Sequence, residues 1–277
     1  MSTQTITKEA AISRTYSRVL TKKQEENGKA LPRPTGFDNI AIGPKFKGIP
    51  DFGDDLLQKR QWQLEHMAAA FRVFARREYR EGTSGHISVR DPIDRDTFWI
   101  NPLGIHFAML KASDMVQLSE TGEIVGGNNA AVNAASYQIH RAIHAARPDV
   151  HAACHTHSKY GKAWSTFGIP LDIINQDTTL FHGDRQIVYD EFGGVVLESS
   201  EGERIAAALG DMAWVCVLQN HGLLTCGRTV DEAADLFNLM ERACEVQLLV
   251  EATGMEKTLI RYIVCLQTPI FGAIDAE

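Results

Sequence analysis

The sequence has no apolar run approaching the roughly 18 residues that a membrane-spanning helix needs. No apolar core follows its first basic residues, so no secretory signal is predicted. Its five cysteines are scattered and form no CxxC pair, a pattern typical of a reduced, intracellular protein with free thiols. Positive charge is also scarce, because 28 Lys and Arg stand against 35 Asp and Glu, a formal net charge of -7. This deficit argues against a nucleic-acid binder and gives no reason to expect attraction to a membrane.

The N-terminal residues depart from this charge pattern. Residues 1–24 carry five basic residues and one acid and are rich in serine and threonine, which faintly resembles a mitochondrial transit peptide. A polar disordered tail has the same composition, so a cytoplasmic location is expected and a mitochondrial one stays open. Four prolines and little helical periodicity predict that residues 1–52 form an N-terminal extension that is partly disordered.

The rest of the chain has the composition of a globular domain, since 44% of the 277 residues are apolar and 23% are charged. Apolar residues at three- to four-residue spacing predict helices over about 55–79 and 230–253. Further helices are expected at 131–146, from about 158 to 167, and at 202–209. Alternating or short apolar runs predict strands at 86–90, 97–100, 115–118, 124–125, 151–156, 187–189, 213–218 and 223–226. This order predicts an α/β domain over 53–254, with a mostly antiparallel central sheet, followed by a short tail over 255–277.

Three histidines are placed as metal ligands would be. His155 and His157 close an apolar strand as a His-Thr-His triplet, and residues i and i+2 of a strand share a face. His221 ends another apolar strand, just before Gly222, which permits a sharp reversal. Three imidazoles with an open fourth position are typical of a catalytic metal site. Without His221, the alternative interpretation of His155 and His157 is that they are solvated or hydrogen-bonded histidines that bind no metal.

Four motifs resemble the class II aldolase/adducin family over about residues 60–253. They are Ser84-Gly85-His86-Ile87-Ser88-Val89-Arg90, Asn101-Pro102-Leu103-Gly104, Arg147-Pro148-Asp149-Val150 with His155-Thr156-His157-Ser158, and Gln219-Asn220-His221-Gly222.

The resemblance implies a three-layer fold with helices on both faces of the sheet. It also implies that His155, His157 and His221 bind a divalent metal, zinc in most members and Fe(II) in some relatives. It further implies a homotetramer with sites near subunit interfaces and a small-molecule carbonyl or hydroxy-acid substrate. The residues expected near that substrate are Ser84, Gly85, His86, Arg90, Asn101, Gly104 and Ser136.

The sequence departs from the phosphosugar aldolases of this family at the groups that hold phosphate and move protons. Their Ser-Ser-Glu run is replaced by Ala134-Ala135-Ser136, and their Gly-Asn-Val-Ser loop by Gly85-His86-Ile87-Ser88. A phosphorylated substrate is therefore not expected. Either another group transfers the proton, or the reaction needs no strong base, as in a retro-aldol cleavage or the decarboxylation of an activated β-keto acid. The candidates for that group are His86, His182, Asp177 and Tyr189.

Three functions stay open on these residues. The first is a metal-dependent lyase, of aldolase or decarboxylase type, acting on a non-phosphorylated carbonyl compound. The second is a non-haem iron oxygenase on the same scaffold, although such sites more often use two histidines and a carboxylate. The third is a non-catalytic, adducin-like binding module, which the complete set of three histidines disfavours.

Overall fold

The computed structural model describes residues 48–80, 83–191 and 199–261. In these ranges no helix is long and apolar enough to cross a membrane. The helices are α2 (Leu56–Arg76), α3 (Ala134–Ala146), α4 (Lys159–Ser165), α5 (Ser199–Leu209) and α6 (Val230–Glu251). The strands are β1 (His86–Arg90), β2 (Phe98–Ile100), β3 (Val116–Leu118), β4 (Ile124–Gly127), β5 (Ala152–Thr156), β6 (Gln186–Tyr189), β7 (Val215–Leu218) and β8 (Gly222–Gly227). Every predicted helix and strand is therefore present, with ends that move by a few residues.

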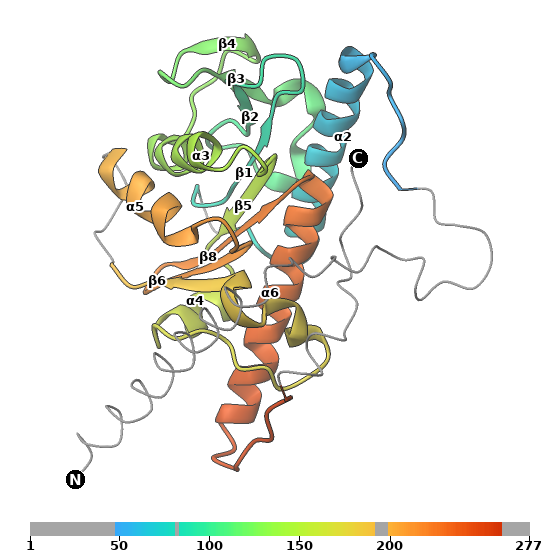
Figure 1. Cartoon of the computed structure of the whole chain (residues 1–277). Helices are drawn as coiled ribbons and strands as arrows, with labels where there is room; N and C mark the ends of the chain where they lie inside the picture. Colours follow the sequence, from blue (N-terminus) through green and yellow to red (C-terminus); the bar gives the residue numbers. More distant parts are fainter. Residues whose placement is uncertain (1–47, 81–82, 192–198, 262–277) are drawn as a thin grey trace, which may run out of the picture. The chain divides into compact units, whose positions relative to one another are not determined.

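One sheet contains all eight of these strands, in the order β4-β3-β2-β1-β5-β8-β7-β6 (Figure 1). Each neighbouring pair is antiparallel except β6 and β7, which run parallel and are joined through α5. The predicted α/β fold with a mostly antiparallel sheet is confirmed. Most of the predicted extension over 1–52 and of the tail over 255–277 lies outside the described residues.

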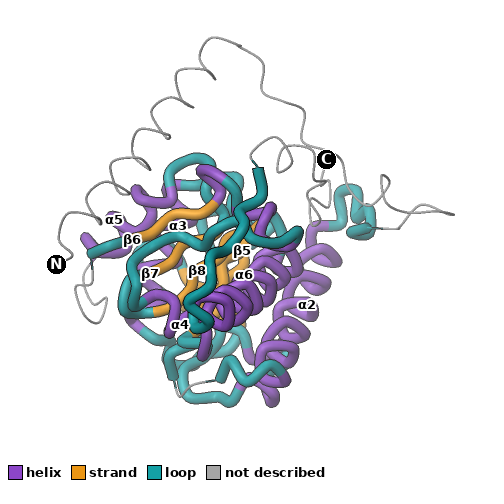
Figure 2. Tube along the Cα trace, turned by 90° about the horizontal axis from the view of Figure 1, so that it is seen from below, coloured by secondary structure: helices purple, strands orange, loops and turns teal. Residues whose placement is uncertain are grey.

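Side-chain alternation along the strands divides the interior into two layers. Ile87 of β1 and Cys154 of β5 face a core that also contains Phe71 of α2 and Phe237 of α6. The opposite face of the sheet packs on α3 and α5 through a second core that includes Ile143. Figures 1 and 2 show α2 and α6 side by side on one face of the sheet, with α3 and α5 on the other. The result is a layer of helices, the sheet and a second layer of helices.

The central strands bring the histidine motifs together. In the register between β1 and β5, His86 lies opposite His155 and Ser88 lies opposite Ala153. Because side chains alternate, His86, Ser88 and His155 all project toward the α3 face. Strand β8 pairs with the other edge of β5, so the turn that precedes β8 reaches the same end of the sheet.

The turn between β7 and β8 differs in one detail from the sequence prediction. The left-handed backbone conformation belongs to Asn220, with φ 56°, and not to Gly222. Gly222 instead permits a close approach, because an added Cβ would lie 3.0 Å from the Thr156 carbonyl oxygen. Asparagine tolerates this conformation better than most residues do, so the reversal occurs one residue before His221.

Candidate metal centre

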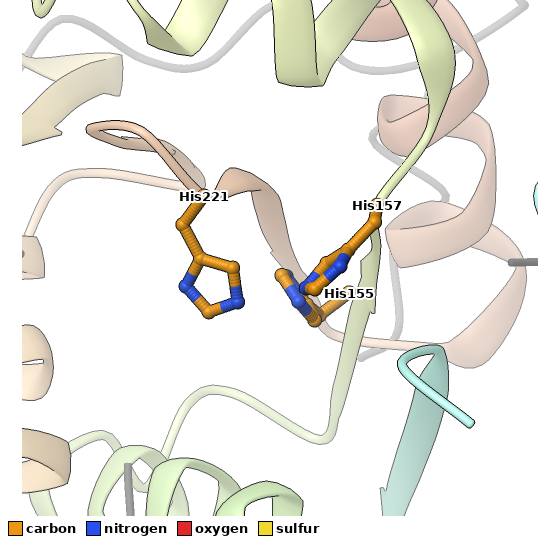
Figure 3. Close-up of side chains that lie close together, drawn as sticks. All are labelled: His155, His157 and His221. Carbon is orange, nitrogen blue, oxygen red and sulfur yellow. The ribbon is translucent and has the colours of Figure 1, made fainter. Parts of the chain in front are cut away.

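Three imidazoles converge at the ends of β5 and β7, as Figure 3 shows. The ligand atoms of His155, His157 and His221 all lie within 4.8 Å of one another. The ring centroid of His221 is 4.7 Å from that of His155 and also 4.7 Å from that of His157. Zinc–nitrogen bonds of about 2.0–2.1 Å place tetrahedral ligand atoms about 3.3 Å apart, so the ligand atoms that are farthest apart here must move closer to bind one ion. The predicted triad is therefore assembled by the fold.

The orientation of His155 is fixed by a backbone carbonyl. Its Nδ1 lies 2.7 Å from the carbonyl oxygen of Leu223. A carbonyl only accepts hydrogen bonds, so Nδ1 carries the hydrogen and Nε2 keeps the lone pair that a metal needs. Metal-binding histidines commonly donate their second ring N–H in this way, so the arrangement fits a bound divalent cation.

Burial keeps two of these imidazoles neutral, which is the form that binds metals. Desolvation, followed by the neighbouring His221, His86 and His157, lowers the pKa of His155 well below its usual value. Desolvation and then His157 lower the pKa of His221 to about 4. Both rings therefore present lone pairs at neutral pH.

A buried carboxylate that the sequence analysis missed fixes the chain just after His157. Glu241 of α6 accepts hydrogen bonds from Ser158 Oγ at 2.5 Å, from the Tyr160 N–H at 2.8 Å and from the Gly161 N–H at 2.7 Å. It caps the first turn of α4, where amide hydrogens lack partners within the helix. A glutamate within the apolar stripe of a long helix was the available sequence signal for this contact.

A second group of polar side chains lies behind the triad on the α3 face. The ring centroid of His86 is 4.8 Å from that of His155, and its Nδ1 lies 2.6 Å from Nε2 of His140. Ser88 Oγ contacts both His140 Nδ1, at 2.5 Å, and His144 Nε2, at 2.8 Å. All four side chains of this group are buried. His140 and His144 are four residues apart and so share one face of α3, and this face packs on β1.

Other residues expected near the substrate form the loop beside β1. Gly85, Asn101 and Gly104 line one small pocket with Asn133 and Phe107. Asn101 accepts a hydrogen bond from the Ile87 N–H and donates one to the Gly85 carbonyl, which holds the loop against β1.

Two further residues predicted near the substrate precede β1 or begin α3. Ser84 lies two residues before His86 and is partly exposed. Ser136 is buried in the first turn of α3, where its hydroxyl donates to the Asn133 carbonyl. Contact of either residue with substrate stays a prediction.

Arg90 lies at the opposite end of β1 from His86. Its guanidinium donates hydrogen bonds to the carbonyl oxygens of His144, Arg147, Val150 and Arg95. These contacts tie the connection between α3 and β5 to β1. The geometry favours this structural role, and binding of a substrate carboxylate by Arg90 stays a prediction.

The other three candidates for proton transfer, besides His86, occupy other parts of the chain. Tyr189 is buried in the core shared with α3 and α5, and its hydroxyl accepts a hydrogen bond from Arg204 at 3.3 Å. Asp177 lies 4.0 Å from the guanidinium of Arg242. His182 precedes a short 3-10 helix, and burial lowers its pKa. Their catalytic roles stay predictions.

Residues 65–248 match the family model of the Class II Aldolase and Adducin N-terminal domain. The Meiotically up-regulated gene 14 protein of Schizosaccharomyces pombe is 50% identical over 208 residues, which cover 75% of this chain and 80% of that protein. Decarboxylase NovR of Streptomyces niveus is 40% identical over 228 residues, covering 82% of this chain and 81% of that protein.

Two further similarities connect the chain to named enzymes. The 4-hydroxy-3-prenylphenylpyruvate oxygenase/4-hydroxy-3-prenylbenzoate synthase of Streptomyces roseochromogenus subsp. oscitans is 38% identical over 228 residues, covering 82% of this chain and 79% of that protein. Among solved structures, L-fuculose 1-phosphate aldolase from Glaciozyma antarctica PI12 superposes with a TM-score of 0.72 at 38% identity, covering 79% of this chain and 85% of that one. The residues matched by the family model, 65–248, include all eight strands of the described sheet and helices of both layers.

Proposed function

Because the chain belongs to the class II aldolase and adducin family, we propose that it is a divalent-metal-dependent lyase acting on a non-phosphorylated carbonyl compound. The observation that carries the proposal is the triad of His155, His157 and His221, whose ligand atoms lie within 4.8 Å of one another. These residues would hold the metal, with zinc as the first expectation and Fe(II) as the alternative. When bound, a divalent metal supplies Lewis-acid stabilisation of the negative charge that develops on a carbonyl oxygen.

The residues around the triad support a substrate without phosphate. Ala134 and Ala135 offer no hydroxyl groups, and the hydroxyl of Ser136 donates to the Asn133 carbonyl. Strand β1 begins with the bulky His86 where the phosphosugar aldolases have an asparagine. A carboxylate or hydroxyl next to the reacting carbonyl is the substrate chemistry that this site favours. The relative named decarboxylase NovR agrees with carbon–carbon bond cleavage of such a compound.

The chain's own residues supply orientation and a protected environment. His155 is held by the Leu223 carbonyl and is 1% exposed, whereas His157 and His221 are partly exposed. The site is therefore closed on the side of the sheet and open at the strand ends, where a small molecule can enter. Among the candidates for proton transfer, His86 has its ring 4.8 Å from that of the triad residue His155.

A second candidate function is an iron(II)-dependent oxygenase on the same triad. One observation favours it, since a relative 38% identical to the chain is named as a prenylphenylpyruvate oxygenase. The two functions differ in what they consume, because the oxygenase requires O₂ and the lyase does not. Oxygen uptake with keto-acid substrates therefore distinguishes them.

We also propose a cytoplasmic homotetramer with its sites near subunit interfaces, as in related aldolases. The partly exposed His157 and His221 support sites that lie at the molecular surface. Light scattering coupled to size-exclusion chromatography tests the assembly, and a monomeric mass would contradict it.

The metal content of the protein tests the proposed function. The full chain is purified without oxygen or chelator, and metals are measured in the wild type, in His155→Ala and in His151→Ala. His151 precedes the same strand but contacts Arg95, so its variant is the matched control. About one equivalent of zinc is expected in the wild type and the control, with loss in His155→Ala. Iron in place of zinc would favour the oxygenase, and no metal after reconstitution would contradict both enzymes.

The substrate claim is tested with paired compounds. Hydroxy-keto acids and phosphosugars are assayed with the metal-loaded protein, and cleavage of the former alone is expected. Efficient phosphosugar cleavage would contradict the expected substrate class.

A further inference from the structure

The polar group behind the triad forms one continuous chain of hydrogen bonds. It runs from His86 Nδ1 to His140 Nε2 at 2.6 Å, from His140 Nδ1 to Ser88 Oγ at 2.5 Å, and from Ser88 Oγ to His144 Nε2 at 2.8 Å. It ends where His144 Nδ1 meets the Val150 carbonyl oxygen at 3.3 Å. We call His86, His140, Ser88 and His144 the histidine chain. The triad histidines and Glu241 account for none of these contacts.

The Val150 carbonyl lies at the end of the histidine chain away from the triad. It determines which atoms donate in the two hydrogen bonds nearest to it, those of His144 and Ser88. Because the Val150 oxygen only accepts, His144 Nδ1 carries a hydrogen. Burial, reinforced by the guanidinium of Arg90, lowers the pKa of His144 to about 3, so the ring is neutral and its Nε2 accepts. The Ser88 hydroxyl therefore donates its single hydrogen to His144.

The same reasoning continues toward the triad. Having donated its hydrogen, the Ser88 oxygen must accept from His140, so His140 Nδ1 carries the hydrogen. His140 is fully buried, and desolvation keeps its ring neutral, which leaves Nε2 as an acceptor. His86 Nδ1 must then donate to His140.

We infer that the histidine chain fixes His86 with its hydrogen on Nδ1, so that Nε2 accepts a hydrogen bond from a hydroxyl group of the substrate. The ring of His86 lies 4.8 Å from the ring of His155, in the opposite register position on β1, which places it beside the metal site. Burial of the His86 ring disfavours an imidazolium, so the neutral form is retained. This acceptor role rests on the proposed function, whereas the tautomer does not.

The inference narrows the substrate class. A lone pair on Nε2, the ring nitrogen directed away from His140, favours a hydroxylated compound, such as a hydroxy acid or a hydroxy-keto acid, over the corresponding compound without the hydroxyl. His140, Ser88 and His144 are positioning residues, since they act on the substrate through His86. His86 also occupies the position of the asparagine in the phosphosugar aldolases. An asparagine amide has a separate donor and acceptor, so it needs no neighbouring residues to set these roles.

Nitrogen-15 NMR on the full chain, labelled at histidine, tests the tautomer directly. His86→Asn identifies the His86 resonances. In the metal-free wild type, the hydrogen is expected on Nδ1 of His86. A hydrogen on Nε2, or on both nitrogens, would overturn the inference.

Ser88→Ala removes the central hydroxyl and breaks the chain into two parts. His86 is then expected to lose its single tautomer and to show a mixture or the Nε2–H form. Ser165→Ala is the matched control, because Ser165 is equally buried but its hydroxyl donates within α4 to the Lys162 carbonyl. If His86 is unchanged in Ser88→Ala, the chain does not set its tautomer. Thermal unfolding verifies that both variants fold, and Ser88→Thr, which restores a hydroxyl, provides a second route should Ser88→Ala fail to fold.

The acceptor role is tested with the smallest hydroxy acid. Glycolate added to the zinc-loaded protein is expected to shift the His86 Nε2 resonance more than acetate does, and Ser88→Ala is expected to abolish the difference. Equal shifts, or none, would overturn the acceptor role. A protein that binds no zinc would remove that role together with the proposed function, while the tautomer result would stand independently.

Discussion

Glu241 is a charged residue in an otherwise apolar part of the interior, and its position explains why it is retained there. The side chain is 3% exposed, and burial raises its pKa even though three hydrogen bonds oppose that shift. All three donors belong to residues 158–161, directly after the ligand His157. The carboxylate therefore couples α6 to the backbone that carries a metal ligand.

Replacing this carboxylate by an amide should weaken both the fold and the site. Glu241→Gln retains the shape but turns an NH₂ group toward a backbone N–H that needs an acceptor. We expect a loss of about 1–3 kcal/mol in the free energy of unfolding and a roughly 10-fold weaker zinc affinity. Urea unfolding and competitive zinc titration measure the two effects.

Glu65→Gln is the control for the charge change, because Glu65 is exposed on α2 and accepts a hydrogen bond from Gln61 of the same helix. It should change stability by no more than about 0.5 kcal/mol. Unaltered zinc affinity in Glu241→Gln would show that the α4 cap does not position His157.

At the scale of elements, the turn between β7 and β8 delivers His221. The His221 N–H donates to the Leu218 carbonyl at 3.0 Å, and Asn220 adopts φ 56° to make this possible. The Asn220 N–H also donates to the Ser165 carbonyl, which joins the turn to α4. The third ligand is thus placed by backbone geometry that few residues adopt at low cost.

Substitutions at Asn220 should separate backbone strain from side-chain chemistry. Asn220→Val forces a β-branched residue into the left-handed region, and we expect about 1–2 kcal/mol of destabilisation with weaker zinc binding. Asn220→Gly adopts the same conformation freely and should leave zinc affinity close to that of the wild type. Chemical denaturation and zinc titration of the two variants provide the comparison. Equal affinities in both would mean that the turn does not control the position of His221.

The sequence predicts elements well where one face of a segment is regularly apolar. The buried stripe of α2, with Met67, Phe71 and Phe74, has the spacing that identifies a helix. The parallel pairing of β6 and β7 has no such local signal, because it depends on how α5 crosses the sheet. The 3-10 helices Phe107–Met109 and Asp177–Phe181 were missed for a related reason, since they are too short to show a period.

In the site, too, residues close together in the sequence could be predicted, whereas contacts between distant residues could not. His155 and His157 could be paired from strand periodicity alone, and His221 joined them because it ends another apolar strand just before Gly222. The contacts of His140 with Ser88 and His86 join residues more than 50 positions apart, so only the packing of α3 on β1 reveals them. Glu241 likewise meets Ser158 across 83 positions.

At the scale of the whole molecule, an unusual share of the interior is titratable imidazole. His86, His140, His144 and His155 are all buried, and desolvation lowers the pKa of each. In the unfolded chain these rings have pKa values of about 6.5. Below that pH the unfolded state therefore binds more protons than the folded state does. Stability should be fully present above about pH 6.5 and should decrease as the pH falls through the acid range.

His144 provides the cleanest measure of this linkage, because it does not contact the triad. Its pKa falls from 6.5 to about 3 on folding, so it should contribute about 1.4 kcal/mol of stability per pH unit within that window. His144→Gln replaces the ring by an amide that stays neutral, so the slope of unfolding free energy between pH 6 and pH 4 should decrease by about that amount. Ser165→Ala, which removes a buried hydroxyl but no titratable group, should keep the wild-type slope. Urea unfolding of the metal-free protein across this range gives the slopes. An unchanged slope in His144→Gln would mean that His144 takes up its proton in the folded protein, which would also remove the anchor that gives the histidine chain its direction.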